Sequence, residues 1–349
     1  MVSYFLGANT PTGFYSLYDD LLPPEKAKTL YILKGGPGCG KSTCMRRVAK
    51  AAQAAGEPVE TVLCSGDPDS LDAVLLPRQG VALVDGTAPH VGEPKCPGAV
   101  ERYVNLGEAY DYQALSGLKE DIRAAKEGYQ ACYEQAYRAL RAVRALRETY
   151  RDALLSPELF TKITQQTEKL ISREFAVPFP GGGVTRRFLS AFTCQGHLCR
   201  WESVEDQCPN VYELVDPYGL APLLLIPLLA AAVRSGEQVV LCLSPLFPDR
   251  PEHLLLPERG LAFVTSTPAL PWPGKVKGRI HLEKPVPRAL MPRLRCTQRW
   301  SEELSEEAAA ALARAKAKHD ALEAVYHPHV DFGVVDRMAD DICAQLHLG

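Results

Sequence analysis

The stretch that decides the fold is Gly35-Gly36-Pro37-Gly38-Cys39-Gly40-Lys41-Ser42-Thr43. It has the complete spacing G-x-x-x-x-G-K-[ST] of a phosphate-binding loop. A short apolar stretch at residues 30–33 precedes it, and an alanine-rich segment at 44–55 follows it and ends at Gly56. Strand, glycine loop and helix in this order are the context that the motif needs. The sequence therefore predicts that these nine residues bind the phosphates of a nucleoside triphosphate.

The chemistry expected of this loop follows from its residue types. Glycines let backbone N–H groups turn inward around phosphates, and the following helix points its positive end at them. Lys41 is expected to reach the β- and γ-phosphates, and the Ser42 hydroxyl to hold Mg²⁺. The apolar run at residues 80–84 ends in Asp85, whose carboxylate is expected to support the Mg²⁺ as well. The alternative for Asp85 is a cap on the turn that follows.

Two further residues are candidates for positioning water or moving a proton. Asp67 lies in an acidic loop that follows an apolar stretch at residues 59–63, and His90 lies just beyond Asp85. A carboxylate or a histidine in such a place can act as a general base. The alternatives are a turn with a helix cap for Asp67 and an ordinary loop histidine for His90. Cys39 lies where a helix dipole lowers a thiol pKa, which makes redox control conceivable; otherwise it is a small residue that the loop tolerates.

The chain also contains an internal repeat. A shift of 180 residues aligns residues 56–87 with 236–267, and Tyr150 aligns with Tyr326 at a nearby offset. At the 180-residue shift Lys41 falls on Ala221, Ser42 on Pro222 and Asp85 on Thr265. The second copy is therefore expected to have lost its phosphate site.

The fold predicted from this repeat is α/β, with duplicated three-layer α/β/α units of the P-loop NTPase type, each carrying a helical hairpin arm. The first domain is expected at residues 1–180 with its arm at 118–172, and the second at 186–349 with its arm at 301–349. Apolar residues spaced by seven over 118–150 predict one long helix with a coiled-coil seam. The hairpins are expected to pack on each other or on a protein partner. The arginines of this helix are either a solvated face or provide an arginine finger or an anion site: Arg138, Arg141, Arg144, Arg147 and Arg151.

The composition of the chain bears on its expected partners and compartment. The 349 residues carry a net charge of −3 and 46% hydrophobic residues, so neither a membrane nor a nucleic acid is an expected partner. No apolar run has the length of a membrane span. Eleven scattered cysteines in a chain without a signal peptide favour the cytoplasm. Self-association is left open.

Four segments, KGGPGCGKST, CSGDPDSLDAVLLP, VALVDGTAPH and PGAVERYVNLG, together resemble an uncharacterised bacterial family of tandem P-loop ATPase-like proteins. The resemblance covers essentially the whole chain. Family members usually carry a phosphate loop in each half, and this sequence departs from that pattern by losing the second one. The resemblance implies ATP binding and no particular substrate.

The function expected from these features is a Mg²⁺-dependent ATPase that couples its nucleotide state to arm movement or partner binding. ATP is favoured over GTP because the guanine-selecting N-K-x-D tetrapeptide is absent. One alternative is a small-molecule or nucleotide kinase, whose phosphate loop has the same form. Another is a sensor or scaffold that binds ATP without hydrolysing it, which would need Lys41 and Ser42 but neither Asp67 nor His90.

Overall fold

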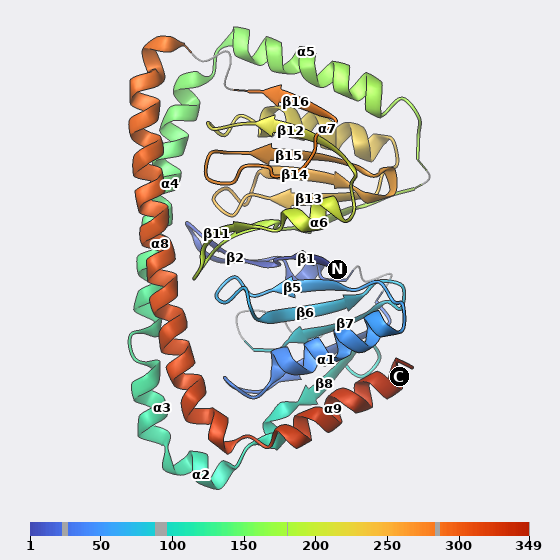
Figure 1. Ribbon diagram of the computed structural model, residues 1–349, viewed down its shortest axis with the longest axis vertical. Helices are drawn as coiled ribbons and strands as arrows, with labels where there is room; N and C mark the ends of the chain where they lie inside the picture. The colour runs from blue at the N-terminus through green and yellow to red at the C-terminus, as the bar shows by residue number, and fades with distance from the viewer. Residues whose placement is uncertain (23–26, 88–95, 180, 283–286, 349) are drawn as a thin grey trace.

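The computed structural model describes residues 1–22, 27–87, 96–179, 181–282 and 287–348. It contains two mixed six-stranded sheets, one from each half of the chain, and the predicted α/β class is confirmed (Figure 1). The first sheet has the order β1 (Val2–Tyr4), β5 (Glu60–Leu63), β6 (Leu71–Leu76), β7 (Val81–Asp85), β4 (Thr29–Lys34), β8 (Glu101–Asn105). The second has the order β9 (Val184–Arg187), β13 (Val239–Leu243), β14 (Pro251–Leu256), β15 (Leu261–Ser266), β12 (Asn210–Val215), β16 (Gly278–His281).

The two sheets have the same strand order, position by position, which agrees with a duplicated unit. In each sheet one strand, β6 or β14, runs antiparallel to both neighbours, and the remaining pairs are parallel. Each unit also contributes a small hairpin, formed by β2 (Gly7–Thr10) with β3 (Gly13–Ser16) and by β10 (Ser190–Thr193) with β11 (Gly196–Cys199).

The units meet along the outer edges of their sheets. Immediately after β1 and β9, Phe5 and Phe188 exchange two backbone hydrogen bonds of 2.9 Å, and both side chains are fully buried. Arg187 reaches across this junction, donating from Nε to Glu60 at 2.7 Å and from Nη1 to the carbonyl of Asp20 at 2.8 Å. Because Phe5 and Phe188 occupy equivalent places in the repeat, the two units are related by an approximate twofold axis at this junction.

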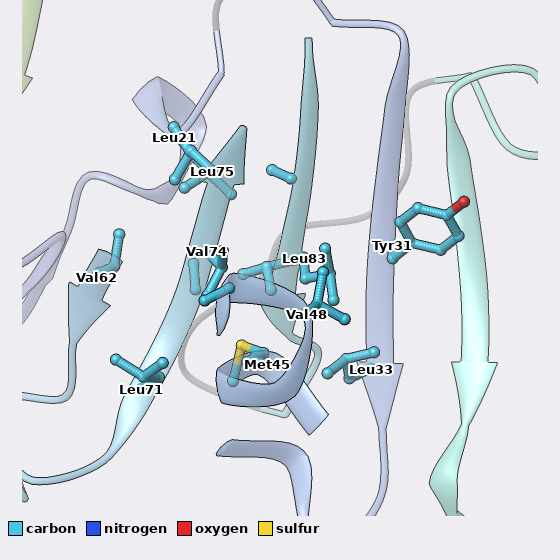
Figure 2. Close-up of a cluster of buried hydrophobic side chains, with 14 of the residues drawn as sticks. Leu21, Tyr31, Leu33, Met45, Val48, Val62, Leu71, Val74, Leu75 and Leu83 are labelled. Carbon is cyan, nitrogen blue, oxygen red and sulfur yellow. The ribbon is translucent and has the colours of Figure 1, made fainter. Parts of the chain in front are cut away.

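One helix of each unit packs on its own sheet. Helix α1 (Lys41–Ala54) rests on β6 and β7, and α7 (Pro222–Arg234) rests on β13 and β14. Figure 2 shows Met45 and Val48 of α1 directed at Leu33, Val74 and Leu83 of the sheet. These side chains are buried, and this packing fixes the start of α1 relative to the ends of the strands.

The long helices line up along the strand ends of both sheets. Helix α4 (Tyr129–Leu154) and helix α8 (Met291–Tyr326) pack side by side over much of their length (Figure 1). The predicted seam is present, since Ala136, Ala139 and Val143 are buried against Ala308 and Leu312. The single helix expected over 118–150 was wrong, because Gly128 adopts a left-handed conformation at φ +74° and separates α3 (Lys119–Lys126) from α4. The short α2 (Tyr112–Gly117) precedes α3, and α6 (Trp201–Glu205) follows β11.

The predicted hairpin on each unit was also wrong, because the terminal helices cross to the opposite unit. Helix α5 (Pro157–Glu174), which begins with a hydrogen bond from Leu159 N–H to Ser156 Oγ, packs on α7 of the second unit. Helix α9 (Phe332–Gln345) packs on α1 of the first unit. Their apolar stripes are buried in those opposite cores: Leu159, Ile163 and Leu170 from α5, and Val335, Ala339 and Ile342 from α9.

No helix within the described ranges combines the length and the apolar character that a membrane span requires. All eleven cysteines lie among the described residues, and none forms a disulfide.

Candidate functional site

The glycine loop joins β4 to α1 and bends around the first residue of that helix. Gly38 and Gly40 have φ values of +68° and +85°, a region that side chains rarely adopt, so glycine is required at both places. Gly40 is the N-cap of α1, and Lys41 is its first residue. The predicted strand, loop and helix are therefore formed in the expected order.

Lys41 and Asp85 are brought together as the sequence predicts. Lys41 Nζ donates to the carbonyls of Gly35 at 2.8 Å and Gly36 at 2.9 Å, and it lies 3.7 Å from Asp85 Oδ2. Asp85 ends β7 beside Leu33 of β4, and its Oδ1 accepts from the N–H of Thr87 at 2.8 Å and from its hydroxyl at 2.5 Å. Asp85 thus caps the following turn with one oxygen and faces the lysine with the other.

Each of the predicted magnesium ligands, Ser42 and Asp85, accepts a backbone hydrogen bond in the structure. Ser42 Oγ accepts a 3.0 Å hydrogen bond from the N–H of Leu71 at the start of β6. Within the described ranges, the three metal-ligand atoms that converge within 4.8 Å of one another belong to His319, Asp320 and Glu323 on α8. That group includes neither Ser42 nor Asp85, so the Mg²⁺ pair stays a prediction.

The second half of the chain covers the glycine loop, a feature that sequence reasoning missed. The N–H of Gly38 donates to Glu323 Oε1 at 3.1 Å, so a carboxylate from α8 already occupies an anion position of the loop. Tyr110 Oη donates to the carbonyl of Pro37 at 3.4 Å, and the side chains of Phe332 and Val335 pack around Gly40. No local signal marks Glu323, because its contact joins residues 285 positions apart.

Of the two candidate general bases, Asp67 lies within the described structure and His90 does not. Asp67 lies in the turn after β5, where its Oδ2 is 3.4 Å from Lys316 Nζ on α8. Partial burial lowers the pKa of Lys316, but the carboxylates of Asp320 and Asp67 outweigh it and raise that pKa overall. Asp67 is therefore paired with α8, and a role in activating water stays a prediction. His90 lies outside the described residues.

Cys39 does not have the environment of a reactive thiol. Its side chain is buried, and burial raises the pKa of the thiol despite the nearby ammonium group of Lys41. A raised pKa leaves little thiolate at neutral pH, which favours the alternative that Cys39 is a small residue that the loop tolerates.

The degenerate loop of the second unit is occupied by its own aspartate. Asp216 accepts from the N–H of Ala221 at 2.6 Å and from the N–H of Tyr218 at 3.2 Å, so its carboxylate lies where the loop amides converge. Burial raises the pKa of Asp216, and these backbone hydrogen bonds partly offset that rise.

The strand pairing corrects the predicted alignment of this loop by one residue. Leu33 pairs with Asp85 and Leu214 with Thr265, and the helices that follow begin at Lys41 and at Pro222. The offset here is therefore 181 and not 180, which places Pro222 opposite Lys41 and Leu223 opposite Ser42. Neither residue supplies a cation or a hydroxyl, so under either alignment the second unit lacks counterparts of Lys41 and Ser42.

The chain matches no protein-family profile, no curated protein and no solved structure.

Proposed function

We propose that the first unit binds ATP with Mg²⁺ at residues 35–43 and that nucleotide binding shifts the contact between this loop and α8. The observation that carries the proposal is the position of Lys41. Its ammonium group lies at the first residue of α1, inside a loop held open by two left-handed glycines and beside the buried Asp85. A cation and a helix N-terminus converging on one loop form a site for a phosphate chain.

The donor set of the loop fits an anion. Gly38 N–H already donates to a carboxylate, which stands in for a phosphate oxygen. In the proposed complex the loop amides and Lys41 hold the phosphates, while Ser42 and Asp85 hold Mg²⁺, which would supply charge neutralisation at the terminal phosphate. For this, Lys41 must exchange its bonds to the carbonyls of Gly35 and Gly36 for phosphate oxygens.

The contact with α8 supports coupling between nucleotide state and the arms. A phosphate bound at Gly38 competes with Glu323 for the same N–H, so bound nucleotide and the observed loop contact exclude each other at that atom. Glu323 belongs to the helix that also carries Lys316, the partner of Asp67. Release of Glu323 is therefore proposed to loosen the end of α8 over the first unit, and the outer faces of α4 and α8 are the proposed surface for a protein partner.

The test is nucleotide affinity by calorimetry together with phosphate release, each measured on the full chain with Mg²⁺. We expect Lys41→Ala to weaken ATP binding by at least about tenfold, the effect of losing a charged hydrogen bond. Lys50→Ala is the matched control, because Lys50 is an exposed lysine of the same helix. Unchanged affinity in Lys41→Ala would reject the proposed site.

Phosphate release then separates the reaction classes. Turnover that is lost in Asp67→Asn while binding persists would support an ATPase in which Asp67 positions water. Binding without phosphate release would support a sensor or a kinase without its acceptor. GTP measured in the same way tests the preference for ATP.

A further inference from the structure

The second unit retains a pocket of about 110 Å³ at the position that the glycine loop occupies in the first unit. The degenerate loop forms its floor through Asp216 and Tyr218, and the facing walls come from the end of α4 and the beginning of α8. Since a water-sized group needs roughly 10–15 Å³ of such space, the pocket has room for a ligand of about ten non-hydrogen atoms.

Arg147 of α4 lines this pocket without a partner of its own. Among the described residues it makes no hydrogen bond or ion pair, whereas Arg151 and Arg250, which also line the pocket, pair with Asp152 and Glu148. Burial lowers the pKa of Arg147, but a guanidinium keeps its charge at neutral pH. Arg147 is half-buried, with the carboxylates of Glu252, Asp216 and Glu302 nearby, so its guanidinium has N–H groups left to donate to a ligand in the pocket.

The internal repeat provides a second observation about Arg147. The offset that aligns Tyr150 with Tyr326 places Arg147 opposite Glu323, the residue that covers the loop of the first unit. Equivalent positions of the two long helices thus carry a carboxylate, Glu323, at the loop with Lys41, and a guanidinium, Arg147, at the pocket with Asp216. A second unpartnered group lies in the same wall, because Ser301 of α8 is 2% exposed and its Oγ has no hydrogen-bond partner in the described structure.

The remaining charges of the pocket select the class of anion. Asp216, Glu252 and Glu302 all line it; Asp216 is buried and Glu252 is half-buried. Burial alone raises the pKa of Glu252, but the imidazole of His253, 3.3 Å away, and a hydrogen bond from Ser190 lower it overall, so this carboxylate is ionised at neutral pH. Three carboxylates near this guanidinium disfavour a doubly charged phosphate more than a singly charged carboxylate.

The walls of the pocket suit an apolar body. Phe247 and Leu294 line it together with Tyr218 and Pro217. We infer that this pocket binds a small monocarboxylate with an aromatic or aliphatic body, its carboxylate held by Arg147 with the Ser301 hydroxyl as a second donor. This site is separate from the proposed nucleotide site and does not depend on it.

The test is titration calorimetry of the full chain with phenylacetate and hexanoate, compared with phenyl phosphate, inorganic phosphate and benzylamine. A ligand of this size in a formed pocket is expected to bind with a Kd of about 1 mM or below. We expect Arg147→Met to weaken the carboxylates at least about tenfold. Arg138→Met, at an exposed arginine on the same helix, should leave their affinity unchanged.

Lys41→Ala separates this inference from nucleotide binding. Phenylacetate affinity that persists in Lys41→Ala, and is lost in Arg147→Met with an unchanged melting temperature, would support the site. The inference is overturned if neither carboxylate binds, if phenyl phosphate binds more tightly than both, or if Arg147→Met binds as well as the wild type. Should Arg147→Met fail to fold, Ser301→Val takes its place, and undiminished binding in that variant overturns the role of this wall.

Discussion

Removal of the carboxylate of Glu323 should increase the affinity of the first unit for nucleotide. Glu323 Oε1 accepts the Gly38 N–H at 3.1 Å, and the side chain is 40% exposed. A hydrogen bond to a charged acceptor contributes about 1.5–3 kcal/mol when buried, and solvent at this exposure reduces that to about 1 kcal/mol. A phosphate that takes over the N–H must first displace this bond. Glu323→Ala is therefore expected to tighten ATP binding about fivefold, and Glu323→Gln, which keeps a weaker acceptor, about twofold.

The assay is calorimetric titration of ATP with Mg²⁺, and again with EDTA, since His319, Asp320 and Glu323 form a group with metal-ligand geometry. A gain of similar size in both titrations assigns the effect to the hydrogen bond. Glu306→Ala, at an exposed glutamate on the same helix, is the control and should bind as the wild type does.

The reasoning is refuted if Glu323→Ala binds ATP as tightly as the wild type or more weakly. Equal affinity would mean that breaking the hydrogen bond between Glu323 and Gly38 requires no free energy, so that this contact does not compete with nucleotide binding. Weaker binding that appears only with Mg²⁺ would mean that Glu323 is itself a ligand in the bound state.

Three further changes test the fold and the loop. Arg187→Met should lower the free energy of unfolding in urea by about 3 kcal/mol, because it leaves the Glu60 carboxylate at the junction without its buried partner. The control Arg186→Met, at a more exposed ion pair, should cost less than about 1 kcal/mol. Equal losses in the two variants would contradict this account. Burial lowers the pKa of His197 to about 4 against 6.5. Between pH 6.5 and 4 the unfolded chain therefore binds a proton that the folded chain does not. As the pH is lowered through this range, the free energy of unfolding should fall by up to about 3 kcal/mol. In urea titrations His197→Asn should remove most of that slope, and a slope equal to that of the wild type would contradict the assignment. Gly38→Ala should lower the free energy of unfolding in urea by about 1–2 kcal/mol, because Gly38 has φ +68°, and it should also weaken ATP binding. Gly117→Ala is the control: a methyl group there meets open space, so this change should be neutral or stabilising. Unimpaired stability in Gly38→Ala would show that the loop relaxes.

The local parts of the site were predictable because they depend on neighbours in sequence. The glycines of the loop, the apolar run before Asp85 and a helix directly after the loop all follow from residue types at short spacing, although α1 begins at Lys41 and not at residue 44. The absence of a lysine and a hydroxyl from the second loop was equally visible, because the repeat places apolar residues opposite Lys41 and Ser42. The one-residue error in aligning that loop arose because a fixed shift hides a small insertion, which the strand pairing reveals.

The exchange of α5 and α9 was not predictable by the same reasoning. The apolar stripe of Leu159, Ile163 and Leu170 identifies one buried face of a helix, but it has the same spacing whether the helix packs on its own unit or on the other. The contact of Glu323 with Gly38 depends on that exchange, since α8 must run past the first unit before α9 can dock on α1. Contacts of this kind are set by tertiary packing, and no short sequence pattern encodes them.

The exchange also gives the two sites a shared element. Helix α8 carries Ser301 in the wall of the second pocket and Glu323 over the glycine loop, about 33 Å apart along a helix that rises 1.5 Å per residue. Helix α4 runs beside it and carries Arg147 at the second pocket. If a carboxylate ligand and a nucleotide each bias the position of this helix pair, thermodynamic linkage requires that each changes the affinity of the other by the same factor. Glu323 at one end and Arg147 at the other are then the two points at which ligands would act on the helix pair.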